Sequence, residues 1–463
     1  MPSIDLSHTI DPRAARNRYV VLPGIAVFAL VFAIYNTNGR EIGSYDSQPT
    51  KFAAVELAQH GSLTLDSVVL RFPVLGERPG FARDRSGHYR SAYPVLPAIV
   101  GGVVATALDR LGVLDLGAAA APAVVAKATA SLLAALAVFL VYAVARRRVT
   151  CWPALLVALG FGLGTNVWAV SSQTLWQSET ALAALCGAVY CLAVPTCQLT
   201  LRRLSVAALL LGLAGAARPQ LAVAVAILGF SVAWRRGRWL DVLAITPLAV
   251  VAAAVIGANV LWFGHPLGAI PRLESLHPAV HGVSSTFGNP FLGAAGLLLS
   301  PSRGLLVFSP VVLVALAGLR EARANGWRDA AWWWALAAAS QFAFYACYAI
   351  WWGGHTYGPR YALDLLPMLV PFAVAGIGWV GATAGRRVVA SLALAWSVAL
   401  AATGAFVYPN DLWNSRPVDV DKDHARLWDY GDPQFVRCWK AGASPQNFDL
   451  FSIQSLRARP VVK

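Results

Sequence analysis

Long apolar runs recur along the whole chain and are separated by short polar segments. Many runs approach the ~20 residues that a helix needs to cross a bilayer, and they are continuously apolar. Of the 463 residues, 57% are hydrophobic and 13% are charged, with a mean hydropathy of +0.57. The pattern therefore predicts an all-α, polytopic helical membrane protein.

About eleven of these runs are predicted to span the membrane. They cover residues 20–36, 124–145, 153–170, 180–194, 204–217, 221–234, 240–262, 304–319, 331–351, 365–380 and 389–407. A further run, residues 93–108, is apolar but contains Pro94 and Pro97 and is followed by Asp109 and Arg110.

The arginines indicate how the spans are oriented, because short basic loops stay on the cytoplasmic side. Arg13, Arg16 and Arg18 precede the first run, so the N-terminus is predicted to be cytoplasmic. If residues 93–108 crossed the membrane, the arginine triplet at 146–148 and every later cluster would lie outside. We therefore expect residues 93–108 to form an interfacial helix on the outer surface. The C-terminus is then outside.

The charge distribution also limits the function classes. A formal net charge of +14 could suit nucleic acid, but the positive residues form short clusters between apolar runs, so no nucleic-acid partner is expected. The polar start and the full-length first run predict no cleavable signal peptide, and the six cysteines indicate no disulfide framework. We expect a transmembrane domain over residues 1–407, with an outer loop at 37–123, and a short external tail over residues 408–463.

The first polar segment, residues 37–66, gathers charges in a chain that has few. It carries Arg40, Glu41, Asp46, Lys51 and Glu56. Residues 47–60 have helical spacing and stop at Gly61, which suits a helix C-cap. Asp46 stands just ahead of that helix and is the leading candidate for a catalytic base. The alternative is a solvated loop acid.

The predicted topology places further polar groups on the same outer face, whereas the cytoplasmic loops hold almost only arginine and small residues. The outer group comprises Tyr93, Gln177, Glu179, Arg218, Arg303, Trp352, His355, Tyr357 and Arg360. Glu179 could instead be an acid favoured by a helix N-terminus, and Arg218 and Arg303 could simply snorkel.

The aromatic, glycine-rich run at residues 352–361 is the sharpest of these features, since it suits close approach of a sugar ring and a phosphate. Its alternative is an aromatic belt at the membrane interface. His265, His277 and His281 lack tight ligand spacing, so neither a metal nor another cofactor is predicted.

The order of these features resembles the GT-C class of glycosyltransferases. These multi-span enzymes use polyprenyl-phosphate-linked sugars and include protein O-mannosyltransferases and lipid A aminoarabinose transferases. The resemblance rests on Asp46 followed by residues 52–61, on residues 93–97, and on Glu179 in a short outer turn. It implies that Asp46 is the base and that Glu179 supports it. Ser47 stands where many relatives have a second acid, so chelation by a paired-acid motif is not expected.

The hypothesis is an inverting sugar transfer at the periplasmic face of a bacterial inner membrane. An acceptor hydroxyl or amine on a glycan, lipid or protein loses its proton to Asp46 and attacks the anomeric carbon, while polyprenyl phosphate leaves. The alternatives are a carrier or flippase for lipid-linked glycans, or a polymerase or ligase of such glycans. The residues expected to bind the donor phosphate are Arg303, Arg360 and, third, Arg218, and those expected to line the substrate site are Tyr93, Gln177, Trp352, His355 and Tyr357.

Overall fold

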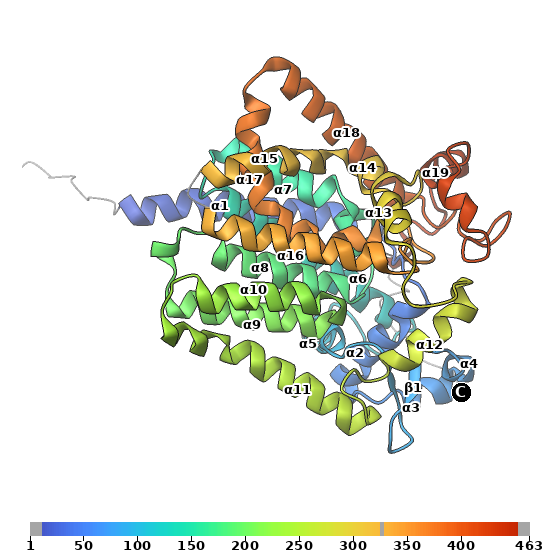
Figure 1. The fold of residues 1–463 in the computed structure, drawn as a ribbon. Coiled ribbons are helices and arrows are strands. Elements are labelled where there is room, and N and C mark those ends of the chain that lie inside the picture. Colours follow the sequence, from blue (N-terminus) through green and yellow to red (C-terminus); the bar gives the residue numbers. More distant parts are fainter. Residues whose placement is uncertain (1–11, 325–327, 452–463) are drawn as a thin grey trace, which may run out of the picture.

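Long helices lie side by side and make up most of the molecule in the computed structural model (Figure 1). The structure describes residues 12–324 and 328–451. The helices that run along the bundle are α1 (Pro12–Asn36), α6 (Ala121–Ala145), α7 (Cys151–Leu163), α8 (Ser178–Leu192), α9 (Leu201–Ala217), α10 (Ala222–Trp234), α15 (Leu313–Ala324), α16 (Arg328–Cys347) and α17 (Leu366–Gly381). Two more, α11 (Thr246–Phe263) and α18 (Ala384–Phe406), are inclined to them. The predicted all-α, polytopic architecture is confirmed.

The shorter elements gather at one end of the bundle, which we call the loop end (Figure 1). They are α2 (Gln48–His60), α3 (Asp66–Arg71), α4 (Pro73–Gly76), α5 (Leu96–Arg110), α12 (Ile270–His281), α13 (Pro290–Leu299), α14 (Leu305–Phe308) and α19 (Gln434–Ala441). An antiparallel pair of strands, β1 (Phe81–Arg83) and β2 (Tyr89–Ser91), lies there too and pairs Phe81 with Ser91.

Short segments of 3-10 or π helix join these elements. They cover Tyr45–Ser47, Val167–Ser171, Thr196–Gln198, Pro219–Leu221, Trp239–Ile245, Pro310–Val312, Arg360–Asp364, His424–Trp428 and Asp449–Phe451.

One prediction for the first polar segment is confirmed in the structure. Helix α2 ends at Gly61, whose φ of 66° is a left-handed C-cap conformation that glycine adopts without strain.

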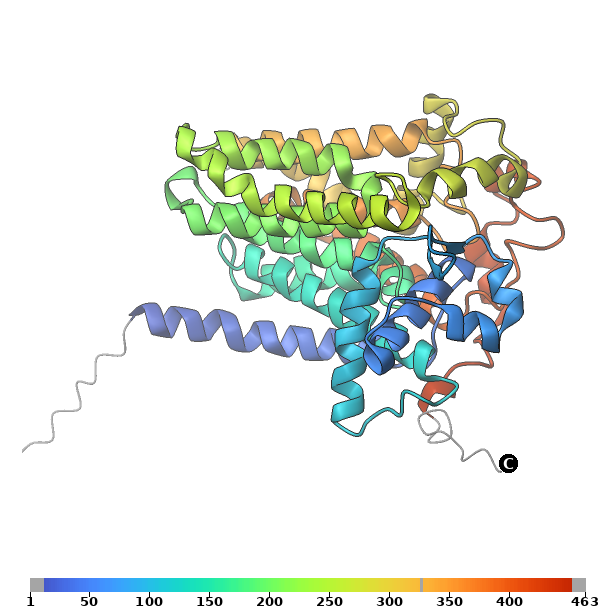
Figure 2. The ribbon, with the colours of Figure 1, turned by 90° about the horizontal axis from the view of Figure 1, so that it is seen from below.

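The run at residues 93–108 forms helix α5, which begins at Leu96, after Tyr93 and Pro94. Figure 2 shows α5 standing across the direction of the long helices. Its placement at the membrane interface stays a prediction.

Two predicted spans are interrupted. The run at residues 153–170 divides into α7, which ends at Leu163, and a π turn at Val167–Ser171. Residues 304–319 were expected to form a single helix, but the structure divides them into α14, a 3-10 turn at Pro310–Val312 and the start of α15. Proline lacks the N–H that a continuous helix requires, so Pro310 ends one helix and begins the next turn. Helix α13 was not predicted; Asn289 caps it by accepting hydrogen bonds from the N–H groups of Phe291 and Leu292.

The predicted count of eleven spans stays a prediction. Among the described residues, three helical stretches are both long and apolar enough to cross a membrane, Ala121–Ala145, Asp241–Phe263 and Ala384–Phe406. Six other apolar helices of the described chain are between 10 and 17 residues long.

Small residues let the helices approach closely, as is usual where lipid supplies no hydrophobic drive between them. In α15, a Cβ added to Gly318 would clash with the carbonyl oxygen of Phe372 in α17. Gly376 of α17 meets the backbone of Val314 in the same way. The two helices thus hold the loop end on a closely packed base.

Candidate active site

A cavity of about 440 Å³ lies at the loop end, between segments that are far apart in the sequence. The first loop, the start of α8, helix α12, the loop at residues 350–361 and the C-terminal tail all contribute to its walls. Of the residues singled out from the sequence, it is lined by Asp46, Tyr93, Gln177, Arg218, His355 and Arg360. The predicted site residues therefore converge in part.

Asp46 lies at the cavity wall in a turn that its own loop holds in place. Ser44 accepts a hydrogen bond from the backbone N–H of Asp46 at 3.2 Å. The Tyr93 hydroxyl donates to Oδ1 of Asp46 at 2.9 Å, while Oδ2 lies 4.0 Å from Arg360 Nη1. Burial, followed by the charge of Asp46, raises the pKa of Tyr93 well above its ordinary value. Tyr93 is therefore a protonated donor at neutral pH.

Arg360 reaches the cavity because glycine shapes the loop before it. Gly353, Gly354 and Gly358 have φ values of 77°, 70° and 58°, a region that other residues rarely adopt. The guanidinium lies 5.0 Å from the ring centroid of Trp176, within the range of a cation–π contact. Among the described residues, the guanidinium makes no hydrogen bond to a protein acceptor, so its N–H groups are available to a ligand.

Arg218 also lines the cavity but is already paired. Its Nε donates to Asp364 at 2.5 Å and its Nη2 to the Tyr345 hydroxyl at 3.1 Å. Tyr345 donates in turn to Asp364, and all three groups are buried. Most of the positive charge of Arg218 is thus compensated. The sequence offered phosphate binding or snorkelling for Arg218, and neither interpretation anticipated this ion pair.

Arg303 does not line the cavity, and the prediction that it contacts a donor phosphate is not supported by its position. Its side chain is 1% exposed and connects three segments of the loop end. It donates to Asn414 and Gln434 of the tail, at 2.6 Å each, and to the carbonyl of Trp352 at 3.1 Å. Its hydrogen-bonding capacity is spent on the protein, so Arg303 holds the glycine-rich loop against the tail.

Three further predicted residues lie away from the cavity surface. Glu179 is fully buried in the first turn of α8, close enough to Arg218 to interact with it electrostatically. Tyr357 is buried and donates to the carbonyl of Leu400, and Trp352 is buried and donates to Asp421. None of the three is among the residues that line the cavity.

A buried polar network anchors the first loop, and the sequence reasoning overlooked it. Lys127, inside α6, donates to Gln173 at 2.7 Å, and Gln173 also accepts from Asn38. Glu41 pairs with Lys51 at 2.6 Å and accepts from Thr174 at 2.5 Å. A lysine within an apolar run was the signal in the sequence, since such a charge requires a partner.

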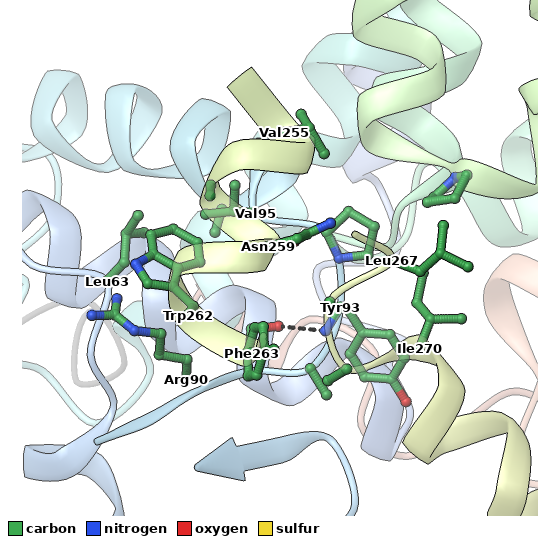
Figure 3. Close-up of a pocket in the computed structure, with 18 of the residues that line it drawn as sticks. Leu63, Arg90, Tyr93, Val95, Val255, Asn259, Trp262, Phe263, Leu267 and Ile270 are labelled. Carbon is green, nitrogen blue, oxygen red and sulfur yellow. Dashed lines mark hydrogen bonds between the residues drawn. The ribbon is translucent and has the colours of Figure 1, made fainter. Parts of the chain in front are cut away.

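A second, much smaller cavity of about 40 Å³ lies behind Tyr93 (Figure 3). Its walls are mostly apolar and come from α5, α11 and the strand pair, with Arg90 over the ring of Trp262 at 4.5 Å. The backbone N–H of Tyr93 donates to Ser91 at 3.2 Å, the contact dashed in Figure 3. Tyr93 thus separates this apolar space from the polar cavity that holds Asp46.

Comparison with known proteins finds neither a matching family model nor a matching curated protein. Solved structures do resemble the chain. ArnT from Cupriavidus metallidurans bound to undecaprenyl phosphate is 14% identical to this chain with a TM-score of 0.47, and the match covers 91% of this chain and 76% of that one. The apo state of the same protein is 11% identical with a TM-score of 0.49, and the match covers 96% of this chain and 78% of that one. Archaeal oligosaccharyltransferase AglB from Archaeoglobus fulgidus, in complex with an inhibitory peptide and a dolichol-phosphate, is 12% identical with a TM-score of 0.46. That match covers 89% of this chain and 60% of AglB.

Two of these solved structures are complexes with a lipid phosphate. At identities of 11–14% and TM-scores below 0.5, this likeness alone does not assign the chain to a family.

Proposed function

We propose that this chain is an integral-membrane glycosyltransferase that moves a sugar from a polyprenyl-phosphate donor to an acceptor at the outer, periplasmic face. The reaction inverts the anomeric centre, with Asp46 as the base and Arg360 as the principal donor-phosphate ligand. The observation that carries the proposal is the meeting of Asp46 and Arg360, 4.0 Å apart, on the wall of the cavity of about 440 Å³.

The two oxygens of Asp46 have different surroundings, which suits a base. Oδ1 is held by Tyr93 at 2.9 Å, so the carboxylate is oriented. Oδ2 faces Arg360, and about half of the side chain (49%) is exposed, which leaves space for an acceptor hydroxyl or amine. A base positioned in this way contributes typically ~10²–10⁴-fold to the rate. As the acceptor attacks the anomeric carbon, its proton passes to Asp46 and the bond to the phosphate oxygen breaks.

The leaving group is a phosphate that is already charged, so it requires cationic stabilisation and no proton. Arg360 has guanidinium N–H groups unused by the described protein and lies on the cavity wall. Arginine binds phosphate oxygens with two parallel hydrogen bonds. Arg218 lines the same cavity and adds a weaker, largely compensated positive charge.

Binding of the lipid phosphate can be measured without knowing the sugar. Wild-type protein should bind undecaprenyl phosphate more tightly than undecaprenol, measured by native mass spectrometry in detergent. Arg360→Ala should weaken phosphate binding by about 10- to 100-fold, the equivalent of one or two charged hydrogen bonds. Arg272→Ala is the matched control, because Arg272 is exposed on α12 and is not among the cavity residues. Equal binding by the two variants would refute the role of Arg360.

Transfer itself is tested with Asp46→Asn, which keeps size and polarity but removes the base. The variant should still bind undecaprenyl phosphate, yet release none from a panel of undecaprenyl-phosphate sugars that the wild type consumes. Full activity of a well-folded Asp46→Asn protein would end the assignment. Movement of intact lipid-linked sugar across vesicles without its cleavage would favour the carrier alternative.

A further inference from the structure

Two histidines and two carboxylates from three separate segments meet at the rim of the cavity. His281 ends α12, His355 lies in the glycine-rich loop, and Asp419 and Asp421 lie in the C-terminal tail. His355 Nε2 is 2.9 Å from Asp419 Oδ1 and 3.5 Å from Asp421 Oδ2. The ligand atoms of His355, Asp419 and Asp421 all lie within 4.8 Å of one another. His281 Nδ1 is 3.0 Å from the other oxygen of Asp421.

His281 contacts Asp421 from the side opposite His355. Its Nδ1 lies 3.0 Å from Oδ1 of Asp421, whereas His355 faces Oδ2. His281 therefore helps to orient the Asp421 carboxylate.

Neighbouring groups orient the carboxylates toward the histidines. The indole N–H of Trp352 donates to Asp421 Oδ1 at 2.9 Å, and the backbone N–H of Asp421 donates to Asp419 Oδ1 at 2.9 Å. Outer hydrogen bonds of this kind are what hold metal-binding carboxylates in place. The Trp352 indole also lies 4.3 Å from the ring of His424, so its own position is constrained.

We propose that His355, Asp419 and Asp421 bind one divalent transition-metal ion of the Zn²⁺ type. An imidazole with two carboxylates suits Zn²⁺, whereas Mg²⁺ and Ca²⁺ prefer oxygen ligands alone. The ion joins the glycine-rich loop and the tail at one wall of the cavity. The spacing of histidines along the sequence could not reveal the site, because its acids come from the distant tail. The test measures bound metal, so it does not depend on sugar transfer.

The test uses full-length protein carrying a purification tag without histidine, stripped with a chelator and then dialysed against Zn²⁺. Metal content after gel filtration should be about one Zn²⁺ per chain, and Co²⁺ substitution should give visible d–d absorption bands. The double variant Asp419→Asn/Asp421→Asn should lower Zn²⁺ affinity by at least about tenfold. Asp423→Asn is the control, since Asp423 accepts a hydrogen bond from the backbone N–H of Ala425 and is not among the three ligands.

His355→Gln serves as a second variant that should fold, because its side chain is 40% exposed. It should also lose Zn²⁺ and should melt at the same temperature with and without the ion. Zn²⁺ content in the ligand variants equal to that of Asp423→Asn, or no Zn²⁺ retained by the wild type, would overturn the proposal. In the latter case the three residues form ion pairs only.

Discussion

Replacement of Arg303 should destabilise the loop end. It should not lower donor binding in an otherwise stable protein. The side chain makes three hydrogen bonds of 2.7 Å or shorter, to the carbonyl of Ser302 and to the side-chain oxygens of Asn414 and Gln434. A longer bond reaches the carbonyl of Trp352 at 3.1 Å. All of these acceptors lie in a buried region.

The size of the effect follows from those acceptors. Each buried acceptor left without a donor costs about 1–3 kcal/mol, so with four acceptors Arg303→Ala should lower the free energy of unfolding by about 4 kcal/mol or more. That is a large fraction of the ~5–15 kcal/mol by which proteins are usually stable. Arg303→Lys should recover little of it, because one ammonium group cannot replace a planar fork that reaches several acceptors.

The assay is thermal unfolding in detergent, followed as the fraction of protein that remains monodisperse on gel filtration after heating. Limited proteolysis of the tail at low temperature gives a second measurement. Arg416→Ala is the control, because the Arg416 side chain is exposed in the same tail. If Arg303→Ala melts with the control and loses only undecaprenyl phosphate binding, Arg303 is a ligand-binding residue and the structural account is wrong.

Three other perturbations test the site and the packing that supports it. Asp364→Ala should destabilise the protein by about 3–5 kcal/mol, because it leaves Arg218 buried without its partner. Adding Arg218→Met should restore part of the melting temperature. If the losses of stability in the two single variants simply add in the double variant, the pairing is contradicted. Gly318→Leu should prevent α15 from packing on α17 and should abolish monodisperse expression, whereas normal expression would show that the close approach is dispensable. Tyr93→Phe should leave the melting temperature nearly unchanged but reduce transfer by about tenfold, through loss of one hydrogen bond to Asp46. If stability falls more than turnover does, Tyr93 has only a structural role in the cavity wall.

Much of the architecture could be predicted because its signals are local. Apolar runs of spanning length mark helices wherever they occur, and Gly61 marks the end of α2 through its own backbone preference. Arginine placement predicted that residues 93–108 do not span the membrane, from the order of loops along the chain alone, and α5 stands across the long helices. The break at Pro310 was equally local and could have been predicted.

The candidate site could be predicted only in outline. Asp46 was conspicuous because charges are scarce in this chain, and Arg360 because it closes a glycine-rich run. Residues that the cavity shares between distant segments, such as Glu274, Asp419 and Asp421, carried no pattern of their own. Their roles depend on which segments the fold brings together.

The sequence by itself determined the helical membrane architecture and the segments that hold the polar residues, because hydrophobicity and charge act on each segment separately. The sequence does not show how available Arg218, Arg303 and Arg360 are to a ligand, since each is an arginine beside an apolar run. The tertiary structure alone decided their roles: an acid pairs with the first, the tail surrounds the second, and the third faces the cavity with its donors unused. The physical reason is that the availability of a charged group depends on its neighbours in space, which are set by helix packing across the whole chain.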